Sequence, residues 1–96
     1  MIITHDIFVC KPGNASKMAK LFKEVMASDP HMKNILTDMT GQFNRVIMVS
    51  EFESLTDYEK AFEQYMNPTP EMKEAMKKME GYTEMYQTGS REIFKV

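Results

Sequence analysis

The sequence predicts an α+β fold in which one four-stranded antiparallel sheet carries helices on one face. Three features of the 96-residue chain support this prediction. Residues 2–10 are rich in β-branched and aromatic side chains, as in a strand. Apolar residues then recur at helical spacing over 15–26. Two further strands, a broken helix and an alternating C-terminal segment follow. A chain of this length fits one domain, which we expect to span residues 1–96.

The first strand and the first helix are separated by a short turn, Lys11-Pro12-Gly13. Either Asn14 or Ser16 can cap the helix that follows. Its apolar stripe faces a core, and lysines cover the opposite side. We expect this helix to end near Ser28-Asp29-Pro30, because proline disfavours helical backbone in the residue before it.

The middle of the chain predicts a hairpin and then a broken helix. Residues 35–40 alternate as a strand, 41–44 form the connection, and 45–53 form the next strand. Ser54, with an acid three residues later, predicts a helix start.

A break follows at residues 67–70, where Thr69 can cap a further helix with Pro70 in its first turn. Gly81 is expected to end that helix. Residues 84–96 alternate as a closing strand. The complete order of elements is the βαββαβ arrangement of ferredoxin-like domains.

The predicted strands are apolar on both faces. Residues 46–49 read Val-Ile-Met-Val, and the first strand has the same character. In this topology both helices cover one face of the sheet. If the other face were exposed to solvent, apolar and polar residues should alternate along each strand. We therefore expect a homodimer whose two sheets pack face to face. The alternative is a sheet whose outer face is exposed to solvent and carries scattered apolar residues, which are common on ordinary protein surfaces.

Composition excludes several classes of function. Twelve basic and 14 acidic residues leave a net charge of −2, so no basic surface for nucleic acid is expected. No apolar run approaches the length of a membrane span, and the N-terminus does not resemble a signal peptide. Cys10 is the single cysteine, which rules out an internal disulfide and multi-cysteine metal sites. We expect a cytoplasmic protein that binds neither membranes nor metals.

Three short motifs resemble a known superfamily. The first strand runs through Lys11-Pro12-Gly13 into a helix, residues 51–54 read Glu-Phe-Glu-Ser, and Tyr58 and Phe62 follow on the next helix. In this the chain resembles the dimeric α+β barrel superfamily, and within it the antibiotic-biosynthesis-monooxygenase-like and NIPSNAP-like families. The resemblance implies a homodimeric barrel with a pocket between helices and sheet in each subunit. It also implies activities that include cofactor-free oxygenation of phenolic polycycles, haem degradation, and isomerase or lyase steps.

The chain departs from this resemblance at two places. Phe52 stands where the superfamily often has tryptophan. Haem-degrading members use a histidine on the late helix, whereas this helix carries Met72, Met76 and Met79. Haem degradation is therefore not expected, and no cofactor is predicted.

Candidate catalytic residues are His5 and Asp6. As neighbours on a strand they point to opposite faces, so one faces the helices and the other faces the dimer partner. Either could help to deprotonate a substrate, although histidine on an apolar strand is more often a core residue. His31 lies in a turn and is expected to be solvated. The candidate ligand-binding residues are Tyr58, Phe62, Tyr65, Met76, Tyr86 and Arg91.

Arg91 has two possible roles. It could bind an anionic ligand, or it could form a salt bridge to Glu51, Glu53 or the partner chain. Methionine is also unusually frequent, at 11 of 96 residues, and fills either a core or an adaptable pocket.

Three functions compete. The first is a small monooxygenase-like enzyme that binds an apolar or aromatic molecule without a cofactor. The second is a non-catalytic module that binds such a molecule. The third is a structural dimer with no pocket.

Overall fold

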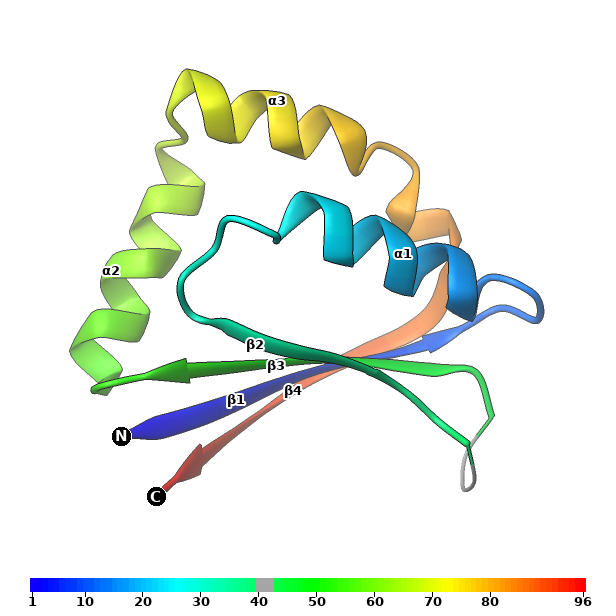
Figure 1. The fold of residues 1–96 in the computed structure, drawn as a ribbon, viewed down its shortest axis with the longest axis horizontal. Helices are drawn as coiled ribbons and strands as arrows, with labels where there is room; N and C mark the ends of the chain where they lie inside the picture. Colours follow the sequence, from blue (N-terminus) through cyan, green and yellow to red (C-terminus); the bar gives the residue numbers. More distant parts are fainter. Residues whose placement is uncertain (40–42) are drawn as a thin grey trace.

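A computed structural model describes residues 1–39 and 43–96. It contains four strands, three α-helices and one short 3-10 helix, in an order that confirms the predicted arrangement (Figure 1). The elements are β1 (Ile2–Cys10), α1 (Ala15–Val25), β2 (Met32–Thr37), β3 (Arg45–Phe52), α2 (Leu55–Met66), α3 (Pro70–Lys78), η1 (Tyr82–Glu84) and β4 (Tyr86–Lys95).

The strands form one antiparallel sheet in the order β2-β3-β1-β4, and the α-helices lie on one face of it (Figure 1). This is the predicted ferredoxin-like α+β fold. Asp6, at the middle of β1, lies opposite Met48 of β3 and Arg91 of β4. Residues directly opposite each other on neighbouring strands share a face. The first and last strands therefore bring distant parts of the chain together under the helices.

The hairpin differs from its predicted bounds. β2 begins at Met32, which pairs with Ser50, and ends at Thr37, whereas residues 35–40 were expected. Asp38 leaves the ladder because its carboxylate accepts hydrogen bonds from the backbone and side chain of Arg45, at 2.7 and 2.8 Å. The predicted connection over 41–44 falls partly outside the described residues. Asn44, within it, has a positive φ of 64°.

Local hydrogen bonds set the starts of the second and third helices as predicted. The hydroxyl of Ser54 accepts from the backbone N–H of Asp57 at 3.2 Å, and that of Thr69 accepts from Met72 at 3.3 Å. Asn14 precedes α1 without a side-chain cap.

Gly81 does not itself end α3, which stops at Lys78. It adopts a positive φ of 84° in the turn that leads into η1. β4 then starts at Tyr86 rather than at residue 84.

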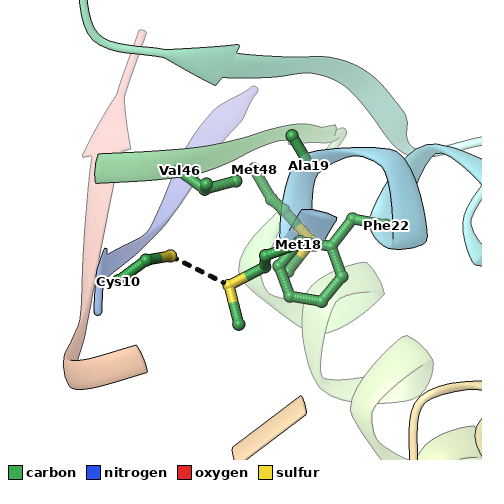
Figure 2. Packing of buried hydrophobic residues seen from close by; sticks show 6 residues of the cluster. All are labelled: Cys10, Met18, Ala19, Phe22, Val46 and Met48. Carbon is green, nitrogen blue, oxygen red and sulfur yellow. Dashed lines mark hydrogen bonds between the residues drawn. The ribbon is translucent and has the colours of Figure 1, made fainter. Parts of the chain in front are cut away.

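The buried core lies between α1 and one end of the sheet. Met18, Ala19 and Phe22 of α1 pack on the strands there (Figure 2). The Cys10 thiol lies 3.4 Å from the Met18 sulfur. Burial, and to a lesser degree the charge of Asp38, raises the pKa of this thiol and makes it a poor nucleophile. The cluster comprises Cys10, Met18, Ala19, Phe22, Val46 and Met48.

The opposite face of the sheet is covered by none of the described helices (Figure 1). His5 lies on this face, because it is opposite Val49 and Glu92 and alternates with the buried Thr4. Its ring packs edge-on against Phe94 at a centroid distance of 5.0 Å. The apolar residues of this outer face are Ile3, Ile7, Val9, Leu36, Ile47, Val49 and Phe94.

Candidate functional site

A pocket of about 480 Å³ lies between the sheet and the helices, toward the Ile2 end of β1 and next to the core, with which it shares Met48. Strands β1, β3 and β4 contribute its floor, and α2 and α3 contribute its walls. The pocket is open, since Phe62, Tyr65 and Met76 on these helices remain 41–46% exposed. Ligand sites commonly have volumes of about 300–1,000 Å³, so this space is large enough for a small molecule.

A charged cluster crosses the floor of the pocket. The Arg91 Nε donates to Asp6 Oδ1, and its Nη1 donates to the Tyr58 hydroxyl at 2.8 Å. The guanidinium also lies over Phe62, 5.1 Å from the ring centroid. Partial burial works against the charge of Arg91, but the hydrogen bond and the negative charge of Asp6 outweigh it and raise the arginine pKa. Arg91 therefore remains a cation that is held in place by β1 and α2.

An aromatic row forms one wall of the pocket. The His31 ring stacks on Phe52 at 4.4 Å, and Phe52 packs edge-on against Tyr58 at 5.2 Å. His31 Nδ1 lies 3.3 Å from the carbonyl oxygen of Glu51. The expectation that His31 is solvated is wrong. The pairing of β2 with β3 brings this turn residue against Phe52, where it is half-buried and borders the pocket.

Asp29 and Tyr65 form a second polar group beside His31. Asp29 Oδ1 accepts from the backbone N–H of His31 at 2.9 Å, and Oδ2 accepts from the Tyr65 hydroxyl at 3.4 Å. Burial, followed by the charge of Asp29 and this hydrogen bond, raises the pKa of Tyr65. The Tyr65 hydroxyl therefore remains protonated and acts as a donor.

The structure brings most of the candidate residues to this pocket. Asp6 borders it, and so do all of the candidate ligand-binding residues except Tyr86. Tyr86 begins β4 at the opposite end of the sheet, where it packs against Phe8 at 5.0 Å and Tyr82 at 5.9 Å. His5 lies on the outer face of the sheet. Of the two adjacent candidates on β1, Asp6 is thus the one that faces the helices.

Both arginines have partners that the sequence did not indicate. Arg91 pairs with Asp6 and not with Glu51 or Glu53, because Glu51 lies opposite Ile3 on the outer face. Arg45 pairs with Asp38 at 2.8 Å. Burial of Asp38 opposes its ionisation, but hydrogen bonds from the Arg45 side chain and backbone prevail and lower its pKa.

Over the described ranges, 1–39 and 43–96, no group of three or more His, Cys, Asp or Glu residues is arranged to hold a metal ion. In the same part of the chain, none of the helices has the length and apolar character needed to cross a membrane.

No protein-family profile matches the chain, and no curated protein matches it in sequence. Solved structures do match it. A NIPSNAP family protein of unknown function from Agrobacterium tumefaciens superposes with a TM-score of 0.77 at 16% identity, over 100% of this chain and 87% of that one. The chain has the fold of the NIPSNAP-like proteins.

Two further structures support this. An uncharacterised NIPSNAP-like domain protein from Burkholderia xenovorans has a TM-score of 0.78 at 17% identity, over 99% of this chain and 84% of that one. An antibiotic biosynthesis monooxygenase has a TM-score of 0.61 at 10% identity, over 100% of this chain and 98% of that one. The predicted resemblance is thereby confirmed at the level of the fold.

Asp29 and His31 are two of the polar pocket residues that were not among the candidate site residues. Both belong to the α1–β2 connection, which has no periodic pattern that could indicate a side-chain direction. Only the pairing of His31 with the end of β3 places them at the pocket.

Proposed function

We propose that this protein binds a small apolar or aromatic molecule in the pocket between its helices and sheet. The observation that carries the proposal is the charged cluster of Asp6, Arg91 and Tyr58 on the floor of an otherwise largely apolar space of about 480 Å³. Mostly apolar walls with a few placed polar groups are typical of small-molecule sites.

The pocket walls suit a flat ligand. Phe52, Tyr58 and Phe62 provide aromatic surfaces, and such rings favour offset or edge-on contacts with another ring. Methionines complete the lining, and their flexible thioether side chains adapt to ligands of different shape. They are Met26, Met32, Met48, Met72, Met76 and Met79.

Oxygenation without a cofactor is a second candidate function, favoured by the carboxylate of Asp6 inside the pocket. Asp6 would take a proton from an activated CH2 group of an aromatic substrate. The resulting carbanion would reduce oxygen and combine with it, and with the proton, to give a hydroperoxide, which would lose water and leave a carbonyl group on the substrate. The neighbour described as an antibiotic biosynthesis monooxygenase motivates this test. With Asp6→Asn, product formation and oxygen uptake should cease while ligand binding persists. Unchanged turnover in this variant would remove Asp6 from the mechanism.

The protein acts, in this proposal, as a homodimer whose two sheets pack face to face. Burying one valine- or leucine-sized side chain contributes about 1.5–3 kcal/mol when it is fully exposed beforehand. The apolar outer face supplies several such groups from each protomer, although most are already half-buried. The summed free energy of burying these side chains is comparable with the ~4–15 kcal/mol that association costs. A reducing compartment such as the cytoplasm suits the unpaired, buried thiol of Cys10.

Native mass spectrometry of the purified protein tests the ligand and the dimer together. A dimer that carries a defined extra mass supports both parts of the proposal and identifies the ligand class. A monomer at micromolar concentration contradicts the sheet-to-sheet dimer. A dimer that takes up no member of a panel of aromatic compounds contradicts ligand binding and supports a structural role.

A further inference from the structure

A histidine and two glutamates share the outer face of the sheet. His5, near the middle of β1, lies directly opposite Glu92 of β4. Glu51 of β3 lies opposite Ile3, which is two positions from His5 and therefore on the same face. Directly opposite residues have Cβ atoms about 4.5–5.5 Å apart, and diagonal neighbours lie roughly 7–8 Å apart. The imidazole of His5 thus has two carboxylates as neighbours on adjacent strands.

Apolar side chains surround these three groups. Ile3 and Ile7 flank His5 along β1, Val49 lies opposite it on β3, and Phe94 packs against its ring at a centroid distance of 5.0 Å. None of the described helices covers this face (Figure 1). A second copy packed on this face would therefore take the histidine and both glutamates out of water.

The outer face carries more negative than positive charge. Of the residues that the described strand pairings place on this face, Arg45 is the one permanent cation. It is paired with Asp38 at 2.8 Å, and it lies four positions along β3 from Val49, roughly 13 Å away. Each protomer thus brings two carboxylates and one imidazole to the centre of the face, without a further cation beside them.

A face-to-face homodimer doubles this set of groups, because a two-fold interface uses the same surface of both chains. β1 is an inner strand, so His5 lies within the face and not at its edge. With neutral imidazoles, the carboxylates repel one another and lose water without gaining an opposite charge. Protonated imidazoles supply that charge and form charge-assisted hydrogen bonds with glutamates of either chain. The dimer therefore binds protons that the separate chains hold less firmly.

We propose that His5, together with Glu51 and Glu92, makes the sheet-to-sheet dimer pH-dependent, so that acidification strengthens it. Imidazole is the side chain that ordinarily changes charge between about pH 8 and pH 5. The state that binds more protons gains stability as the pH falls and loses it as the pH rises. This inference rests on the proposed homodimer and adds its regulation. It also gives His5, which lies away from the pocket, a role in assembly.

Sedimentation velocity over a dilution series of the full chain measures the dimer dissociation constant at each pH. We expect this constant to be at least about tenfold lower at about pH 6 than at about pH 8, since each proton taken up contributes up to tenfold per pH unit. Equal constants, or a lower constant at the higher pH, would overturn the inference and leave the dimer standing. Monomers at both pH values would remove the proposed dimer, and the inference with it.

His5→Gln is the matched variant, because its amide is polar and of similar size but does not take up a proton in this range. It should remove most of the difference between the two pH values. His31→Gln is the control, since His31 borders the pocket on the helix-covered side of the sheet, and this variant should keep the full response. A response that persists in His5→Gln would assign it to other groups and overturn the inference.

Glu92→Gln covers the case in which His5→Gln does not fold. Glu92 is exposed on the edge strand β4, so its charge is not needed for the packing of the single chain. The variant should lower the dissociation constant at about pH 8 and reduce the pH response, because one carboxylate per protomer no longer enters the interface. Glu80→Gln, on the exposed turn after α3, should change neither quantity. A Glu92→Gln protein that matches the parent in both quantities would contradict the inference.

Discussion

Asp6 of β1 and Arg91 of β4 lie directly opposite each other in the sheet, and their side chains form an ion pair on the floor of the pocket. Eighty-five positions separate them in the sequence. Their side chains point toward the helices, whereas those of the adjacent pair, His5 and Glu92, point to the outer face. This register decides which polar groups a ligand can meet.

The ion pair should matter more for binding than for stability. We expect Arg91→Met to lower the free energy of unfolding by at most about 1 kcal/mol, because the side chain is 43% exposed and solvent screens the pair. Binding of an aromatic ligand should weaken severalfold, because its donor is lost. Urea unfolding and ligand titration measure the two effects. Arg45→Met is the control, since it breaks the pair with Asp38 and should leave binding unchanged.

The buried core should be sensitive to truncation of its side chains. Phe22 is fully buried between α1 and the sheet, so Phe22→Ala is expected to cost about 3–5 kcal/mol through lost burial and the cavity that remains. Phe43→Ala provides the comparison, because Phe43 is 84% exposed and should contribute little. Equal midpoints for the two variants in urea would contradict this location of the core.

The outer face of the sheet should control assembly. Val49 lies next to His5 on this face, so Val49→Lys would place a charge in the proposed interface. Sedimentation velocity should show monomers for this variant and dimers for the parent protein. Glu80→Lys, on the exposed turn after α3, is the charge control. A Val49→Lys protein that remains dimeric would exclude sheet-to-sheet packing.

The raised pKa of the Cys10 thiol predicts a loss of stability at alkaline pH. Burial raises the thiol pKa above its ordinary value of 9.0, so above that pH the unfolded chain releases this proton more readily than the folded protein does. The free energy of unfolding should therefore fall as pH rises through the unfolded value. Cys10→Ala should lessen this dependence when urea midpoints are compared between neutral and alkaline buffers. If the urea midpoint of Cys10→Ala falls with pH as steeply as that of the parent protein, groups other than Cys10 cause the effect.

The lowered pKa of Asp38 predicts that stability is lost at acid pH. Because Arg45 lowers the pKa of Asp38 below 3.8, the folded protein holds its proton less readily than the unfolded chain. The associated stability is present above the unfolded pKa and is lost as pH falls through the lower, folded value. Asp38→Asn should reduce the acid sensitivity of the thermal midpoint. A variant that loses stability with acid as steeply as the parent would contradict this role.

Local patterns in the sequence determined the elements and their order. Period-two and helical spacing act over a few residues, and the caps at Ser54 and Thr69 are hydrogen bonds across three residues. They therefore need no tertiary contact to be predicted. The apolar character of both sheet faces is likewise a property of each strand by itself.

Only the tertiary structure decided the composition of the pocket. The partner of Arg91 and the inward direction of Asp6 depend on how the two ends of the chain pair, which no local pattern specifies. The stacking of His31 on Phe52 depends on where β2 meets β3. Tyr86 has the aromatic and hydroxyl groups that suit a ligand pocket, but its strand begins with this residue at the other end of the sheet. Short-range preferences are set by neighbouring residues, whereas a site is set by the packing of elements that are distant in the chain.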